Sequence, residues 1–190
     1  MNLVERVKAI LLQPKSEWQV IASEPGDFGT LFSNYVAYVA AIPPVCTFIG
    51  GSIFGLGGIR LGIFVGLIHA VIMYVLALVG VFVVAYVIDY LAGTFDGKKN
   101  LTNSMKVSAY APTAAWVCGV FNLIPALSVL GILGFYSIYL LHTGIVALMK
   151  PPESKAIIYT IAVIVCVFIV YLVVFGIIGA LFGIGMMSRY

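Results

Sequence analysis

Long apolar runs, interrupted by a few short polar stretches, make up most of the chain. Only one charged residue, Arg60, lies between positions 31 and 88, and positions 107–149 contain none. A helix needs about 20 apolar residues to cross the roughly 30 Å hydrocarbon core of a bilayer. The pattern therefore predicts an all-α membrane protein, a polytopic bundle of five transmembrane helices at residues 31–54, 62–88, 105–121, 125–149 and 156–186.

The third of these segments is the least regular. It carries Lys106 near its start, Tyr110 and Pro112 in its middle, and Asn122 directly after its end. Proline removes a backbone hydrogen bond from a helix, and unpaired polar groups are costly in hydrocarbon. A re-entrant segment is therefore the alternative to a full crossing at residues 105–121.

Residues 1–30 precede the first span and have a half-polar pattern. Apolar residues recur there at the spacing of one helical face, and charged residues occupy the remaining arc: Leu3, Val4, Val7, Ile10 and Leu11 against Glu5, Arg6 and Lys8. This pattern is typical of an amphipathic helix that lies in a membrane interface. We predict a cytoplasmic amphipathic interface segment at residues 1–30 and a transmembrane domain at residues 31–190. A frayed tail is the alternative for residues 1–30.

Single residues mark where this N-terminal helix ends and a second one begins. Pro14 ends the first helix, since proline cannot continue it. Ser16 stands three residues before Gln19, the spacing of a capping box, and so predicts the start of a second short helix. Trp18 suits the level of the lipid headgroups, where an amphipathic ring finds both apolar and polar surroundings. We therefore expect Trp18 to anchor the segment at the membrane interface.

Composition supports the membrane prediction and adds an orientation. Hydrophobic residues make up 63% of the 190 residues and charged residues 9%, against about 25% charged in a soluble domain. With five spans and a cytoplasmic N-terminus, all Lys and Arg residues except Arg60 and Arg189 fall on the cytoplasmic side. The positive-inside rule then predicts an inner N-terminus and an outer C-terminus. The net charge of +3 is too small to indicate nucleic acid, so the expected partner is the lipid bilayer.

Three stretches resemble a known family. They are "QPKSEW" followed by "LFSNYVAYVAAIPPV", then "GTFDGKKNLTNSMKVSAYAPTAAWVCGVFNLIP", and "IYLLHTGIVALMKPPESKAIIYT". Together they look like the YIP family, the Ypt/Rab-interacting membrane proteins, in its short prokaryotic form. The resemblance implies a five-span bundle in a prokaryotic cytoplasmic (inner) membrane with a cytoplasmic N-terminus, and it brings no reaction. Eukaryotic relatives are associated with Rab GTPases and carry an Asp-Leu-Tyr-Gly-Pro-like element. This sequence does not contain that element, so Rab binding is not carried over.

Polar residues and prolines inside the predicted spans are the candidate functional positions. They are Asn34, Pro43, Pro44, His69, Tyr110, Pro112, Asn122 and His142. The prolines either break helices that line a substrate pathway, as in many transporters, or produce packing kinks. In the predicted topology His69 and His142 lie close to the middle of the membrane. A proton relay or a metal-binding pair is one interpretation of the two histidines, and neutral side chains hydrogen-bonded to neighbouring helices are the other.

The sequence offers no other chemistry. Cys46, Cys118 and Cys166 lie in apolar segments without CxxC spacing, which indicates neither a disulfide framework nor a zinc site. No catalytic triad spacing, zinc-protease motif or phosphate-binding loop is present. We predict a chain without cofactor or catalytic residues, acting as a membrane-organising or protein-interaction component with a protein partner at the cytoplasmic face. Self-association stays open, and a small-molecule or ion transporter with an intramembrane polar pathway is the alternative function.

Overall fold

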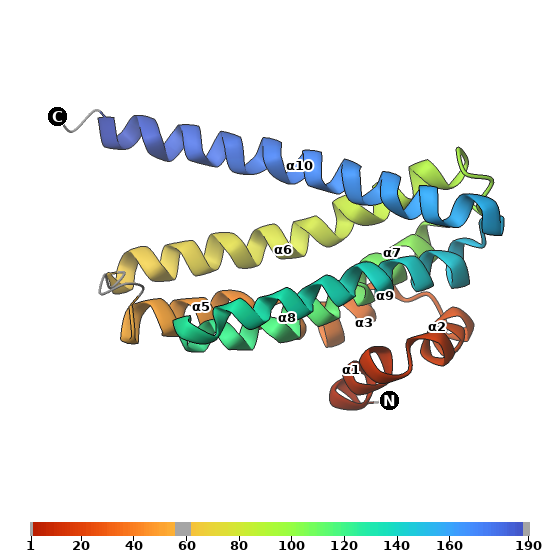
Figure 1. Cartoon of the computed structure of the whole chain (residues 1–190), viewed down its shortest axis with the longest axis horizontal. Helices are drawn as coiled ribbons and strands as arrows, with labels where there is room; N and C mark the ends of the chain where they lie inside the picture. Colours follow the sequence, from red (N-terminus) through yellow and green to blue (C-terminus); the bar gives the residue numbers. More distant parts are fainter. Residues whose placement is uncertain (1, 56–61, 188–190) are drawn as a thin grey trace.

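The computed structural model describes residues 2–55 and 62–187, with side chains described through Val173. Its elements are helices of α, 3-10 or π type (Figure 1). Four helical segments of the described residues are long and apolar enough to cross a membrane: Phe28–Ile53, Ile63–Ala92, Pro125–Met149 and Glu153–Val173. The prediction of an all-α polytopic bundle is confirmed. Arg60 and Arg189, predicted on the outer side, lie outside the described residues.

The predicted span at 105–121 is not a continuous helix. It consists of α7 (Leu101–Tyr110), α8 (Thr113–Cys118) and the 3-10 helix η2 (Gly119–Leu123). The break falls at Ala111 and Pro112, because the proline nitrogen has no hydrogen to continue the helical ladder. A long 3-10 helix, η3 (Pro125–Phe135), follows and leads into α9 (Tyr136–Gly144) and the π-helix η4 (Ile145–Met149).

The first span is broken in the same way. Its parts are α3 (Phe28–Leu31), η1 (Phe32–Val36), α4 (Ala37–Val39) and α5 (Ile42–Ile53). The ladder is interrupted at Ala40 and Ala41, and α5 then begins with prolines in its first turn. Proline is well suited to that position, because the first amides of a helix have no helical acceptor. Pro43 and Pro44 therefore start a new helix rather than bend an old one.

These two proline-broken segments lie side by side and run in the same direction. Four of the close contacts between them pair residues 75 or 76 positions apart in the sequence: Gly26 with Thr102, Tyr35 with Tyr110, Pro43 with Gly119 and Thr47 with Asn122. This near-constant separation means that the segments stay in register along most of their length. Gly50 allows the last part of this approach, since a Cβ there would lie 2.1 Å from the Asn122 backbone oxygen.

Two short helices, α1 (Leu3–Leu12) and α2 (Pro14–Ser23), precede the spans. The capping box lies at α1, where Asn2 and Glu5 bond reciprocally to backbone amides. The capping box predicted at Ser16 is wrong, because α2 already begins at Pro14 and its N-cap, Gln13, makes no side-chain bond. The Ser16 hydroxyl instead donates back to the Gln13 carbonyl oxygen at 3.0 Å.

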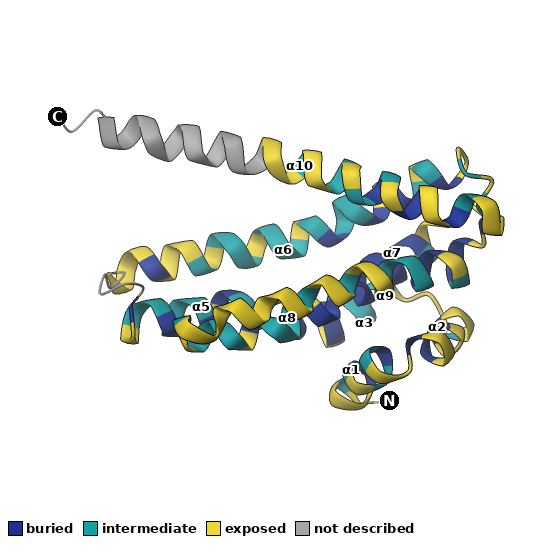
Figure 2. Ribbon diagram, viewed as in Figure 1, coloured by how far each residue is buried: buried dark blue, intermediate teal, exposed yellow. Residues whose placement is uncertain are grey.

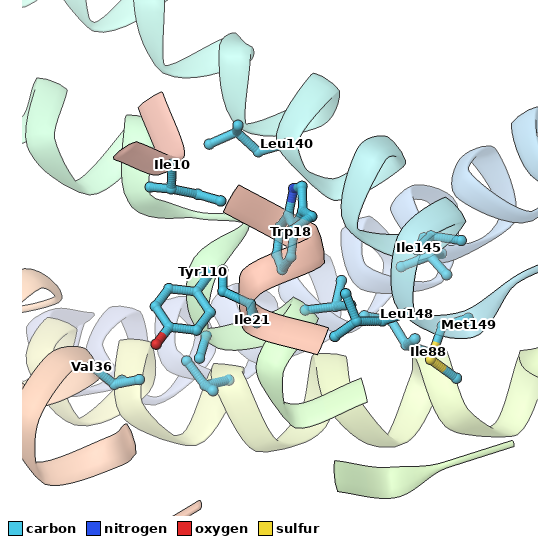
Figure 3. Packing of buried hydrophobic residues seen from close by; sticks show 14 of the residues in the cluster. Ile10, Trp18, Ile21, Val36, Ile88, Tyr110, Leu140, Ile145, Leu148 and Met149 are labelled. Atoms are coloured by element: carbon cyan, nitrogen blue, oxygen red, sulfur yellow. The ribbon is translucent and has the colours of Figure 1, made fainter. Parts of the chain in front are cut away.

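The densest core lies where α1 and α2 meet the spans (Figures 2 and 3). Its fully buried apolar residues include Ile10, Trp18 and Ile21 from the N-terminal helices and Leu140, Ile145 and Met149 from α9 and η4. The two long helices, α6 (Ile63–Ala92) and α10 (Glu153–Met187), add Ile88 and Tyr159 to the same cluster. The N-terminal helices and the spans thus share one core.

Candidate functional site

A buried ion cluster forms where α1 and α2 pack together. The Arg6 guanidinium pairs with the carboxylates of Glu17 on α2 and Glu24 just beyond it, and the Arg6 side chain is 8% exposed. The sequence places Arg6 on the charged arc of α1, and the structure buries it there, because α2 folds back and supplies two carboxylates to that face. Burial alone would lower the pKa of Arg6, but the bond to Glu24 and the neighbouring charges raise the pKa above its ordinary value.

Tyr110 of α7 joins this cluster to the spans. Its ring centroid lies 5.7 Å from the Arg6 guanidinium carbon, close enough for a cation–π contact. The ring also meets Trp18 edge-on, with centroids 6.2 Å apart, and Tyr35 at 4.5 Å. The Tyr35 hydroxyl in turn lies 2.7 Å from Thr113 Oγ1. Tyr110, predicted as an intramembrane site residue, is thus the centre of an aromatic cluster.

Lys106 closes the cluster from the side of α7. Its buried ammonium donates to the backbone oxygens of Ile21 at 2.8 Å and Glu24 at 2.7 Å. Carbonyl groups in the last turn of a helix lack helical donors, so a cation is favourable there. A cavity of about 40 Å³ beside Lys106 has room only for a few water molecules. The cluster therefore fastens the N-terminal helices to the spans and offers no space for a substrate.

Trp18 lies inside this interface. Its side chain is fully buried, and the indole Nε1 donates to Thr143 Oγ1 on α9 at 3.0 Å. Figure 3 shows the ring between Leu140 above and Tyr110 and Ile21 below. The structure therefore differs from the expectation of a lipid-facing anchor, because protein encloses the ring on all sides. Sequence reasoning missed Thr143 as its partner, since 125 positions separate the two residues.

The other predicted site residues do not converge. Asn34 and His69 are exposed on η1 and α6. His142 Nδ1 lies 2.9 Å from Thr160 Oγ1 on α10, and Asn122 Nδ2 donates to Thr47 Oγ1 at 3.1 Å. Each of these two interior bonds joins a pair of neighbouring segments. In the described part of the chain, no three side chains of His, Cys, Asp or Glu gather as metal ligands would.

A cavity of about 370 Å³ lies beside the break at Pro112. Most of its walls are apolar side chains of α6, α9 and α10, and its polar positions include Ser108 and Ser137. The Ser108 carbonyl is four residues before Pro112 and so receives no helical hydrogen bond from it. The Ala115 amide is also diverted and donates to Ser137 Oγ at 2.9 Å. The break thus leaves backbone polarity next to an apolar chamber.

A second, larger hollow of about 670 Å³ lies along the junction of α2 with α9 and η4. Two lysines from distant parts of the chain, Lys15 and Lys150, line it together with His142 and Gln19. This basic groove could not be predicted, because nothing in the local sequence pattern shows that α2 lies against the end of the fourth span.

Comparison with known proteins identifies relatives of the chain. The Yip1 domain family matches residues 8–187 of the chain. The inner membrane protein YohC of Escherichia coli K12 is 31% identical over 163 residues, which cover 81% of this chain and 84% of YohC. YohC of Escherichia coli O6:H1 matches with the same identity and coverage. No solved structure matches the chain.

Proposed function

The chain belongs to the Yip1 domain family and is a multi-pass inner membrane protein, and on this premise we propose that it is a non-enzymatic membrane-organising or protein-interaction component. The family resemblance seen in the sequence is confirmed by the match over residues 8–187. The protein acts through the cytoplasmic surface formed by α1, α2 and the loops beside them.

The observation that carries this proposal is the fastening of the N-terminal helices. Among buried charged residues, Arg6 and Glu17 tie α1 to α2, and Lys106 together with the Arg6–Tyr110 contact holds both helices against α7. Burying a charged group costs desolvation free energy, which is offset only when the group finds partners of opposite charge or hydrogen-bond partners. Buried charges that are all paired in one fixed arrangement support a preformed docking surface rather than a loose tail. Val4 and Leu12 remain exposed on α1 and give that surface apolar contact area.

We also propose five crossings, with the N-terminus in the cytoplasm. Residues 101–123 run parallel to the span Phe28–Ile53 and stay in register with it. A segment that matches a full span along its length supports a full crossing, although its helix is interrupted at Pro112. Backbone breaks at membrane depth are tolerated where neighbouring helices cover them. With five crossings, the positive-inside rule supports the cytoplasmic location of α1 and α2.

Crosslinking in native membranes tests the interaction function. A photoreactive residue at Leu12 should capture one defined protein partner, or a second copy of the chain, whereas the same residue at Val129 of η3 should not. Both positions are exposed and apolar, so the comparison is matched. The variant Val4→Glu/Leu12→Glu should abolish the capture and reproduce the phenotype of a gene deletion at unchanged thermal stability. Unchanged capture and a wild-type phenotype would contradict the proposal.

The chamber at Pro112 favours a second candidate, a transporter of small molecules. Its mostly apolar walls, with the polar side chains of Ser108 and Ser137 among them, suit an amphiphilic substrate better than an ion. Current recordings on liposomes with purified protein distinguish the two functions. Substrate-dependent currents that disappear in Ser108→Leu, a substitution that fills the chamber, would establish transport. Indistinguishable current traces for the parent protein and Ser108→Leu would contradict transport and favour the interaction function.

A further inference from the structure

The basic groove between α2 and the end of the fourth span takes no part in the function proposed above. Its walls come from two regions of the chain, residues 15–19 and 139–150, and comprise Lys15, Gln19, Tyr139, His142, Thr143, Val146, Ala147 and Lys150. The hollow measures about 670 Å³, which is within the size range of small-molecule binding sites. None of its lining residues is acidic.

The two lysines are available for an external anion. Lys15 and Lys150 are exposed, and within residues 2–55 and 62–173 neither forms an ion pair. Three other basic side chains, in contrast, are engaged within the protein: Arg6 with Glu17 and Glu24, Lys106 with two backbone oxygens, and Lys155 with Asp96. The groove therefore combines two cations that the protein itself does not neutralise.

Lys150 occupies an unusual backbone conformation. Its φ and ψ are both 50°, in the left-handed region. This conformation is unfavourable for a residue with a Cβ, and helices commonly end there with glycine instead. Residues in such strained backbone conformations are concentrated at functional sites, where the side chain binds a ligand or takes part in a reaction. At this position glycine would relieve the strain but remove the ammonium group from the groove.

The groove also has the right depth in the membrane. Lys150 directly follows the span Pro125–Met149, so its ammonium lies at the level of the lipid headgroups. Tyr139 and Val146 line the groove farther into the span and are exposed, which provides an apolar wall below the charges. A ligand that fits this gradient has an anionic head and a hydrocarbon tail.

We propose that the groove binds an anionic phospholipid from the adjacent leaflet. The phosphate sits between Lys15 and Lys150, and the glycerol and upper acyl chain follow Val146 and Tyr139. Basic pockets between membrane helices recognise anionic headgroups by this charge complementarity. Docking of α2 by Trp18 and Thr143 builds one wall, so the site exists only in the assembled fold. The inference does not depend on the interaction function.

Native mass spectrometry of the full-length protein tests the site. Phosphatidylglycerol should bind more tightly than phosphatidylcholine, and the affinity should fall about fivefold for each lysine removed, at about 1 kcal/mol per lysine. The test variants are Lys15→Gln, Lys150→Gly and the double variant, and Lys8→Gln on α1 is the control for the loss of one exposed charge. Lys150→Gly should keep or raise the melting temperature without lipid, because it removes the strain. Should it fail to fold, Lys150→Gln replaces it.

Four results would overturn the assignment. One is equal binding of both lipids to the parent protein. The second is an unchanged preference for phosphatidylglycerol in the double variant, and the third is a loss of affinity in Lys8→Gln as large as that in Lys15→Gln. The fourth is equally tight binding of free glycerol phosphate, since this would identify a site for soluble phosphate esters rather than for lipid.

Discussion

The indole ring of Trp18 lies directly against Gly144. A Cβ on Gly144 would lie 2.7 Å from Trp18 Cζ2 and 2.9 Å from Cη2, closer than real Cβ atoms approach other atoms. The ring has no room to move away, because its Nε1 donates to Thr143 and its side chain is fully buried. The absence of a side chain at residue 144 is therefore what lets α2 dock onto the fourth span.

Gly144→Ala should destabilise the protein by about 1–3 kcal/mol, the usual cost of overpacking a core. A Gly→Ala substitution inside a helix usually stabilises it by about 1 kcal/mol, so the change in stability expected here has the opposite sign. Thermal unfolding of the purified protein in detergent measures the change. Gly131→Ala is the matched control, because Gly131 has open space around the position of its missing Cβ. A melting temperature of Gly144→Ala equal to or above that of Gly131→Ala would show that the contact is not tight.

The hydrogen bond from Trp18 to Thr143 should appear as a coupling energy. Trp18→Phe removes the donor and Thr143→Val the acceptor, and we expect the pair to be coupled by about 0.5–1.5 kcal/mol. The measurement is a double-mutant cycle on thermal stability. Thr160→Val serves as the control partner for Trp18→Phe, because Thr160 is bonded to His142 instead. Additive effects of Trp18→Phe and Thr143→Val would contradict the bond.

Arg6→Leu should cost about 3–5 kcal/mol, because it leaves the buried carboxylate of Glu17 without its cation. The double variant Arg6→Leu/Glu17→Leu should recover most of this loss, since an apolar pair replaces the ion pair. Lys8→Leu, on the exposed face of the same helix, should change stability by no more than about 0.5 kcal/mol. The prediction fails if Arg6→Leu and Lys8→Leu melt at the same temperature.

The fold could be predicted from the sequence wherever a long apolar run is sufficient to define a transmembrane helix. The helices at Ile63–Ala92 and Pro125–Met149 follow from hydrophobicity alone, as does the membrane class. The segment at 105–121 was harder, because hydropathy shows how apolar a run is and not where its backbone hydrogen bonds break. Pro112 marked the break, but only packing against the first span shows how the break is covered.

The candidate site was predicted less well, and for a physical reason. The local pattern places Arg6 on the charged arc of an interfacial helix and Trp18 at the lipid headgroups, since water and lipid are the surroundings that an isolated helix meets. Both residues are buried, because α1, α2 and the fourth span cover one another. Contacts of this kind join residues such as Trp18 and Thr143 that are 125 positions apart, and local periodicity carries no information about them.

Labelling of single cysteines distinguishes five crossings from four. In a background with Cys46, Cys118 and Cys166 replaced by alanine, Lys98→Cys reports on the loop before residues 101–123 and Ile124→Cys on the turn after them. Both positions are exposed and lie outside the spans, so both should react with a membrane-impermeant maleimide. If residues 101–123 cross the membrane, the reagent reaches Ile124→Cys in intact spheroplasts and Lys98→Cys only in inverted vesicles. A re-entrant segment would return to its starting side, so both cysteines would react from the cytoplasmic face, and the five-span proposal would then be wrong.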